Sequence, residues 1–145
     1  MLRTFTQSDI GPVLAIEEKV HIAPWNEETF KTCFQQGYKG WVLEVENKIV
    51  GFIIVSITYD ECHILNICVN HEYQRQGYGK LLMEHMQDHA KTAGIAVIYL
   101  EVRRSNSRAI RLYEKMNFHL IGERKNYYPT VSGHEDALIL AKKIR

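Results

Sequence analysis

A short polar loop, Gln74–Lys80 (QRQGYGK), separates a strand-like run from a strongly periodic helical segment, and this junction narrows the possible folds more than any other feature. The run before it, residues 62–69 (CHILNICV), alternates as a β-strand does. The segment after it, residues 80–94 (KLLMEHMQDHAKTAG), has the spacing of an amphipathic helix that ends at a glycine. A strand, a glycine-containing loop and a helix in this order predict a mixed α/β fold with an anion site at the helix N-terminus.

Periodic segments elsewhere complete an α/β pattern around this junction. A first helix is expected to begin near Ser8 or Asp9, whose side chains are good N-caps, and a second to follow the N-cap Asn26. Two β-rich runs flank the polar turn at residues 46–48 and predict a hairpin. The further expected elements are a short first strand, a buried strand over 95–102, a helix over 106–118, and two closing strands over 118–125 and 136–144 around a long polar loop.

Length and composition are those of an ordinary globular unit. The chain has 145 residues, of which 46% are hydrophobic and 24% charged, and a chain of this size can bury a substantial core. No repeat and no linker rich in Pro, Gly or Ser divides it. We therefore expect residues 1–145 to form a single domain.

Net charge and cysteine content limit the cellular compartment and the classes of binding partner that are expected. The net charge of +1 provides no global basic field of the kind that binds nucleic acid. The three cysteines form no CxxC pair and leave an odd thiol, which favours a reducing compartment. The longest apolar run, residues 49–57, is about half a membrane span, and the start of the chain lacks the apolar run of a signal peptide. We expect a cytoplasmic protein that binds neither a membrane nor nucleic acid directly, and we take it to be a monomer.

Several uses compete for the loop Gln74–Lys80. A dinucleotide fingerprint would need a third glycine at Leu82. A Walker loop would need a glycine at Gln74 and a Ser or Thr at Leu81. Backbone N–H groups of Gly77–Lys80 at a helix N-terminus would bind another kind of anion, and the neighbouring cations would add charge. A turn that needs a positive φ at one glycine, with solvated cations, remains the alternative.

The loop and a later segment together carry a family resemblance. Residues 74–79 (QRQGYG) resemble the (Gln/Arg)-x-x-Gly-x-(Gly/Ala) signature of the GCN5-related N-acetyltransferase (GNAT) family. Residues 104–118 (RSNSRAIRLYEKMNF) resemble a second segment of that family, although Asn117 stands where glycine is commoner. The resemblance implies a GNAT fold: mixed α/β, with a central, mostly antiparallel twisted sheet of about six to seven strands, about four helices, and a splayed pair of parallel strands that holds acetyl-CoA.

The resemblance also assigns residues to acetyl-CoA, the expected co-substrate, and none to a metal. The loop would hold the pyrophosphate, the preceding strand would hold the pantetheine arm, and Asn106 would contact that arm. The residues concerned are Ile67, Cys68, Val69, Arg75, Gln76, Gly77, Tyr78, Gly79, Lys80 and Asn106. Cys68 stands where a small residue is usual, and it could act as a covalent nucleophile or simply fill buried space.

Two residues are candidates for the proton transfers of amine acetylation. By resemblance, Glu101 matches the proton acceptor of the family and Tyr113 the proton donor. An α-amine, with a pKa of about 7.8, costs roughly 1 kcal/mol to deprotonate at pH 7, whereas a lysine costs roughly 4.6 kcal/mol. From the residues alone, Glu101 could instead pair with Arg103 or Arg104. Tyr113 could simply pack its helix onto the sheet.

Within the family, the chain is most similar to bacterial members that acetylate the N-terminal alanine of the eighteenth small-subunit ribosomal protein. The similarity includes residues 23–30 (APWNEETF), 126–129 (NYYP) and 135–140 (EDALIL). It implies that the partner is an acceptor protein N-terminus, namely that of a small-subunit ribosomal protein. The residues expected to contact the acceptor peptide are Pro24, Trp25, Tyr127 and Tyr128. The two tyrosines could instead pack on the strands of their own hairpin.

Other constellations are weaker. His85 and His89 lie four residues apart on a helix, but no glutamate of an HExxH motif and no third ligand accompanies them. Residues 134–136 (HED) could be part of a catalytic triad, but the chain has no GxSxG motif that would supply the serine nucleophile. Three hypotheses remain: an acetyltransferase for a protein N-terminus, one for a lysine or small amine, and a non-catalytic module that binds coenzyme A or the ribosome.

Overall fold

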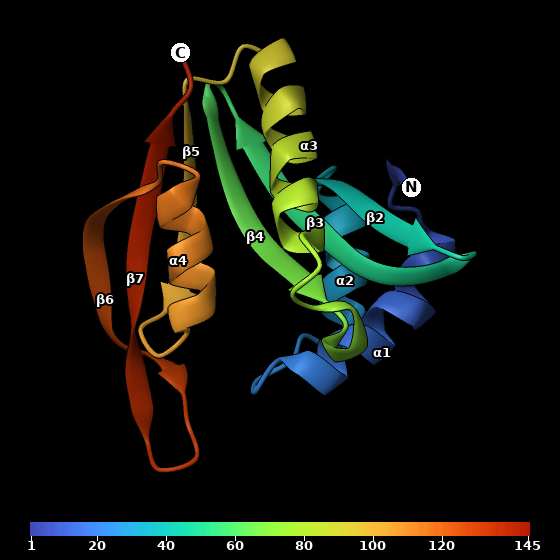
Figure 1. Ribbon diagram of the computed structural model, residues 1–145, viewed down its shortest axis with the longest axis horizontal. Helices are drawn as coiled ribbons and strands as arrows, with labels where there is room; N and C mark the ends of the chain where they lie inside the picture. Colours follow the sequence, from blue (N-terminus) through green and yellow to red (C-terminus); the bar gives the residue numbers. More distant parts are fainter.

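The computed structural model describes residues 1–145 and contains one seven-stranded sheet with helices on both faces (Figure 1). The strands are β1 (Leu2–Thr4), β2 (Lys39–Val45), β3 (Lys48–Thr58), β4 (Glu61–Val69), β5 (Val97–Arg103), β6 (His119–Pro129) and β7 (His134–Lys143). The helices are α1 (Ile10–Val20), α2 (Glu27–Gln35), α3 (Tyr78–Thr92) and α4 (Ser107–Lys115). The strand order is β1-β2-β3-β4-β5-β7-β6, and β4 and β5 form the single parallel pair. The expected mixed α/β architecture is confirmed.

The two faces of the sheet have separate apolar cores. Helices α3 and α4 cover one face, where the buried residues include Leu82, Met86 and Tyr113. Helices α1 and α2 cover the other, around Phe30 and Phe52. None of the helices combines the length and the apolar character that a membrane span requires.

Local signals in the sequence place most element boundaries. The Asn26 side chain accepts a hydrogen bond from Thr29 N–H at 2.9 Å and so caps α2 as expected. Helix α3 stops just before Gly94, which has φ +78°. The expected cap of α1 is wrong in detail: the Asp9 carboxylate accepts from Thr6 N–H at 2.8 Å, in the short turn before the helix.

The closing hairpin differs from the expected one. Strand β6 continues through Pro129, which pairs with His134, so the connection spans residues 130–133 and no long polar loop exists. The missed part of the strand contains a register shift between Arg124 and Tyr128 and a positive φ at Asn126. Such a bulge breaks the period-2 pattern on which the sequence expectation relied. Tyr127 and Tyr128 therefore lie on a strand.

The sheet opens between β4 and β5, the splayed parallel pair that was expected. Their pairing begins at Glu61 with Val97 and stops at Ile64 with Leu100, although both strands continue. On its other edge, β4 carries a register shift against β3 that leaves Leu65 without a partner. The ends of β4 and β5 therefore form the two sides of an opening that no strand fills (Figure 1).

Candidate active site

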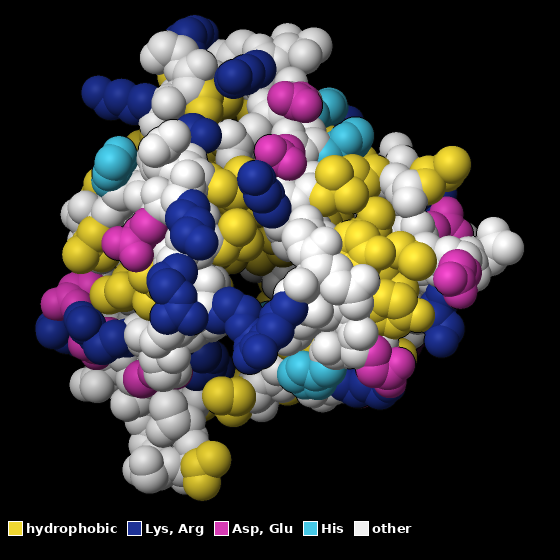
Figure 2. Space-filling view, viewed as in Figure 1, with side chains coloured by type: hydrophobic (Ala, Val, Ile, Leu, Met, Phe, Trp, Pro, Cys, Tyr) yellow, Lys and Arg dark blue, Asp and Glu magenta, His cyan; other side chains and the backbone are white.

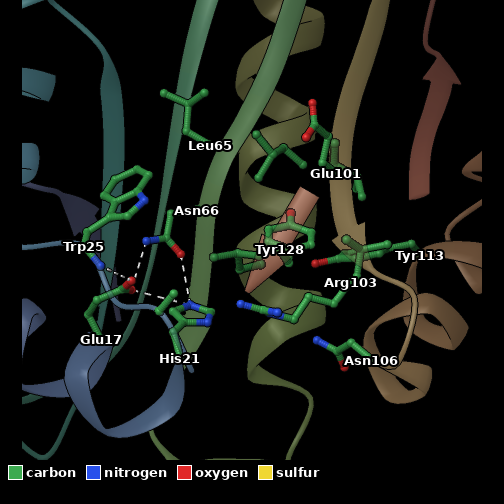
Figure 3. Close-up of a pocket in the computed structure, with 15 residues that line it drawn as sticks. Glu17, His21, Trp25, Leu65, Asn66, Glu101, Arg103, Asn106, Tyr113 and Tyr128 are labelled. Carbon is green, nitrogen blue, oxygen red and sulfur yellow. Dashed lines mark hydrogen bonds and ion pairs between the residues drawn. The ribbon is translucent and has the colours of Figure 1, made fainter. Parts of the chain in front are cut away.

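A cavity of about 190 Å³ lies where β4 and β5 separate. Figure 2 shows a hollow near the centre of this face with Lys and Arg side chains beside it. Figure 3 shows the residues around the cavity, which come from both sides of the opening. They are Glu17, His21, Ala23, Trp25, Ile64, Leu65, Asn66, Ile67, Leu100, Glu101, Val102, Arg103, Asn106, Tyr113 and Tyr128.

The loop before α3 presents a run of free backbone donors. Gly77 has φ +83° and serves as the N-cap, and the first backbone bond of the helix joins Leu81 N–H to Gly77 O at 3.0 Å. None of the backbone N–H groups of residues 75–80 donates to another group of the protein. Consecutive unpaired donors at a helix N-terminus are a site for a phosphate or pyrophosphate.

Gln74 fixes this loop to two other elements. Its Nε2 donates to Val69 O at 2.9 Å, at the end of β4, and its Oε1 accepts from Arg108 Nη1 at 2.8 Å, on α4. Gln74 opens the loop signature, but the sequence alone predicts neither of these contacts. The contact with α4 joins the two family segments in space, because Arg108 belongs to the second of them.

Glu101 lies on β5 at the cavity with its carboxylate partly exposed. Its Oε1 accepts from Arg124 Nε at 3.0 Å. The expected alternative pairing is wrong, since Arg103 pairs with Glu135 and Arg104 with Glu123. Arg124 lies on β6. The register of this strand, and with it the contact to Glu101, cannot be predicted from the sequence alone.

Tyr113 both packs α4 onto the sheet and faces the cavity. It is buried, and its ring centroid lies 6.1 Å from that of Phe118. Burial raises the pKa of the Tyr113 phenol, so the hydroxyl stays protonated at neutral pH. A protonated hydroxyl at a cavity wall can donate a proton or a hydrogen bond.

Arg103 holds the closing hairpin against β5, a role that the sequence analysis missed. Its Nη1 donates to Pro129 O at 2.8 Å and lies 3.2 Å from Glu135 Oε1. Its guanidinium stands 4.5 Å from the centroid of the Tyr128 ring. Burial, followed by the nearby Glu101 charge, raises the pKa of Tyr128 to about 12.

A second polar network, also missed, lines the α1 side of the cavity (Figure 3). Glu17 is 1% exposed, and its carboxylate accepts from Asn66 Nδ2 at 2.9 Å and from Trp25 N–H at 3.0 Å. His21 Nε2 lies 3.2 Å from Asn66 Oδ1. Two signals for this network exist in the sequence: the i, i+4 spacing of Glu17 and His21, and one amide within the apolar strand 62–69.

The cavity lining contains some of the expected site residues. Its lining includes Trp25, Ile67, Glu101, Asn106, Tyr113 and Tyr128. Asn106 also caps α4, because its Oδ1 accepts from Ala109 N–H at 3.2 Å. Val69 and the loop residues lie outside the lining, beyond the end of β4.

Besides Val69 and the loop residues, three further expected site residues do not line the cavity. Pro24 and Tyr127 are exposed near it. Cys68 is buried in the core beneath α1 and α2, and burial raises the pKa of its thiol. A protonated, buried thiol is a poor nucleophile, so the space-filling interpretation of Cys68 is favoured.

The fold and the site together define a class of protein. A mostly antiparallel sheet that opens between two parallel strands, a loop with free backbone donors at the end of one of them, and a carboxylate and a phenol at the opening are features of a coenzyme-A-dependent acetyltransferase. The Acetyltransferase (GNAT) family model matches residues 11–118. The chain belongs to this family, whose acetyl donor is acetyl-CoA, as expected.

Individual relatives are similar over nearly the whole chain. The [Ribosomal protein bS18]-alanine N-acetyltransferase of Escherichia coli (strain K12) is 41% identical over 137 residues, which are 94% of this chain and 93% of that protein. The crystal structure of the ribosomal-protein-S18-alanine N-acetyltransferase from Escherichia coli superposes with a TM-score of 0.95 at 39% identity, covering 99% of this chain and 93% of the other. The structure of Ard1 from Thermoplasma volcanium gives a TM-score of 0.90 at 26% identity, covering 100% and 97%.

Proposed function

We propose that the protein transfers the acetyl group of acetyl-CoA to the α-amine of a protein N-terminus, namely the N-terminal alanine of the small-subunit ribosomal protein bS18. The name and the full-length similarity of the Escherichia coli relative support this acceptor. The observation that carries the proposal is that Glu101 and Tyr113 face one cavity at the opening between β4 and β5. An acetyltransferase needs a proton acceptor and a proton donor at the same thioester.

The acetyl donor would lie along the β4 side of the opening. The free N–H groups of residues 75–80 suit its pyrophosphate, and Arg75 and Lys80 add positive charge. The pantetheine arm would continue along Ile67, Cys68 and Val69. This part of β4 lies beyond its last pair with β5, Ile64 with Leu100, and has no strand partner on this side. Asn106, across the opening, would donate its amide N–H to the arm, because its carbonyl oxygen already caps α4.

Glu101 and Tyr113 would handle the protons. Arg124 occupies one oxygen of the Glu101 carboxylate, and the other has no protein partner, so it can accept a proton directly or through a water. Tyr113, which burial keeps protonated, would donate to the sulfur that leaves. Attack by the amine on the thioester carbon forms the C–N bond, and loss of the thiol completes the transfer.

The acceptor peptide would enter between the α1–α2 connection and the β6–β7 hairpin. Trp25 and Tyr128 line the cavity from these two sides, and Pro24 and Tyr127 lie exposed beside them. Aromatic rings with polar tips suit an extended peptide, because they supply apolar area together with a hydrogen-bonding group. The α-amine is also easier to convert to the neutral nucleophile, since deprotonating a lysine at pH 7 costs roughly 3.5 kcal/mol more.

The experiment is a comparison of three hexapeptides with acetyl-CoA, followed by release of free thiol. One peptide begins Ala-Arg, the second is the same peptide with its N-terminus blocked, and the third carries an internal lysine as its sole amine. We expect thiol release with the first peptide alone. Release with the lysine peptide alone would replace this proposal with a lysine acetyltransferase. Tight binding of coenzyme A with no release in any arm would leave a non-catalytic module.

We also propose that residues 1–145 work in the cytoplasm as one monomeric domain. One sheet runs from Leu2 to Lys143, and all three cysteines are buried free thiols. Such thiols fit a reducing compartment. Light scattering in solution would test the monomer, and a dimer mass would contradict it.

A further inference from the structure

His21 completes the side of the cavity that faces Glu101 and Tyr113 (Figure 3). We propose that His21 Nδ1 is a second proton acceptor, which removes the first proton from the ammonium of the acceptor, and that Glu17 and Asn66 hold the ring in the tautomer this step requires. This inference rests on the proposed acetylation of an α-amine. It assigns a chemical role to the α1 side of the cavity, whereas the proposed function assigns proton transfers only to Glu101 and Tyr113.

The hydrogen-bond network fixes which ring nitrogen carries the proton. The Glu17 carboxylate can only accept, so Asn66 must present its NH₂ group to it, and the 2.9 Å contact has this arrangement. Asn66 Oδ1 therefore points to His21 Nε2, 3.2 Å away, and Glu17 Oε1 lies 3.4 Å from the same nitrogen. Because both neighbours are acceptors, Nε2 must be the donor. The neutral ring then has its lone pair on Nδ1.

The free nitrogen belongs to a partly exposed side chain that lines the cavity. The two ring nitrogens point in diverging directions, so a ring with Nε2 on Asn66 and Glu17 turns Nδ1 away from both (Figure 3). The His21 side chain is 35% exposed, whereas that of Glu17 is 2% exposed. A buried carboxylate that orients a partly exposed imidazole is a common arrangement for a general base.

The charged and titratable groups around His21 come from every element at the cavity. Helix α1 contributes Glu17, and β4 contributes Cys68, whose sulfur lies within 4.8 Å of both the Glu17 and His21 ligand atoms. Across the cavity stand Glu101 and Arg103 on β5, Tyr113 on α4 and Tyr128 on β6. Burial raises the pKa of the Cys68 thiol and of both tyrosines, so these three groups are neutral at pH 7.

The protons balance with three groups in place. His21 Nδ1 takes one proton from the ammonium, which leaves a neutral amine to attack the thioester carbon. Glu101 takes the proton that the nitrogen sheds once the C–N bond has formed. Tyr113 gives one proton to the departing sulfur and recovers it from Glu101. One proton remains on His21 and leaves to solvent, which matches the single proton that acetylation of an ammonium releases.

The test is the pH dependence of kcat/KM of His21→Gln for the Ala-Arg peptide. Glutamine lacks a basic nitrogen at this position, so the variant reacts only with peptide that is already neutral, a fraction of about one seventh at pH 7 for an α-amine of pKa about 7.8. We expect a loss of roughly sevenfold at pH 7 that grows as pH falls and disappears above about pH 9. His119→Gln, an exposed histidine on β6, is the matched control and should follow the wild type. A loss of equal size at pH 6.5 and pH 9.5 would overturn the proposal.

Glu17→Gln provides a second test with a structural readout. If the introduced glutamine keeps its oxygen on Trp25 N–H, its NH₂ faces Asn66, which must then turn over and present NH₂ to His21. The proton of the ring moves to Nδ1, and the base is lost while the histidine remains. Ring ¹⁵N chemical shifts of the free protein should show Nε2–H in the wild type and Nδ1–H in Glu17→Gln. Nδ1–H in the folded wild type would overturn the proposal, even if no peptide proved to be a substrate.

Discussion

The two sides of the site are built differently: the donor wall is the loop before α3, outside the cavity lining, and the acceptor wall lines the cavity. The wall toward α3 is mostly backbone: six consecutive residues, 75–80, present N–H groups that no part of the protein uses. The wall toward the acceptor is mostly side chains, from α1, β5 and the β6–β7 hairpin. A backbone wall tolerates changes of side chain wherever φ permits, whereas a side-chain wall changes with every substitution. Under the proposed function, cofactor recognition therefore depends on a short motif and acceptor recognition on scattered residues.

The acceptor wall also depends more on charged pairs for its shape. Arg103 joins β5 to Glu135 and Pro129 of the hairpin, and Arg3 joins Asp9 before α1 to Glu44 on β2. On the donor wall the corresponding link is the Gln74 amide, which bonds to Val69 O and to the Arg108 guanidinium without an ion pair. Substitutions can therefore separate the two walls.

The largest effect should come from the proton-transfer pair, which serves both walls. We expect Glu101→Gln and Tyr113→Phe each to lower turnover with the Ala-Arg peptide by on the order of 10²-fold. Neither side chain holds the pyrophosphate, so the affinity for acetyl-CoA should change little. Thiol release and calorimetric titration measure the two quantities. Normal turnover in both variants would remove these residues from the mechanism.

Asp9→Asn should weaken the anchoring of α1 in a pH-dependent way. The hydrogen-bonded Arg3 guanidinium lowers the pKa of Asp9 from 3.8 to about 2. The group therefore contributes stability above pH 3.8 that is lost as pH falls through about 2, and at pH 7 this amounts to about 2 kcal/mol. Urea unfolding should show that deficit at pH 7 and little difference near pH 2. The exposed Asp88→Asn is the control, and an equal deficit at both pH values would contradict the pairing.

A glycine pair tests the donor wall. Gly77 and Gly94 have φ of +83° and +78°, at the two ends of α3, and a Cβ at either would meet no atom within 4 Å. Alanine at each should cost about 1 kcal/mol of unfolding free energy because of the left-handed backbone. Only Gly77→Ala should also weaken acetyl-CoA binding, by roughly fivefold if about 1 kcal/mol of strain is relieved by moving the loop. Equal acetyl-CoA affinities in the two variants would show that the loop does not hold the cofactor.

Arg103→Lys should have the smallest effect and touch the acceptor wall alone. Lysine keeps the charge but cannot reproduce the planar contact with Tyr128 and the bonds to Pro129 and Glu135. We expect KM for the peptide to rise about threefold to tenfold, in line with the loss of about one ordinary hydrogen bond, with kcat and acetyl-CoA affinity unchanged. Arg104→Lys, at an exposed pair, is the control. A change in acetyl-CoA affinity would contradict the assignment of Arg103 to the acceptor wall.

Local features of the chain predicted most of the fold. The periodicity of residues 80–94, the cap at Asn26 and the turn at 46–48 depend on neighbours a few residues away, and each element formed where expected. The errors fell where the period is interrupted. The bulge between Arg124 and Tyr128 hid the second half of β6, and so the two tyrosines expected at the acceptor peptide were assigned to a loop.

The sequence by itself determined the cofactor class, because residues 74–79 and 104–118 resemble two segments of an acetyl-CoA-dependent family and a glycine loop that opens a helix can bind an anion with its own backbone. Tertiary structure decided the rest of the site. It paired Glu101 with Arg124, joined Gln74 to Arg108 across 34 positions, and placed Asn66 against Glu17 across 49. Side-chain partners so far apart depend on strand register and helix packing, which no short segment contains. The acceptor side, with His21 among its residues, is therefore visible only in the folded chain.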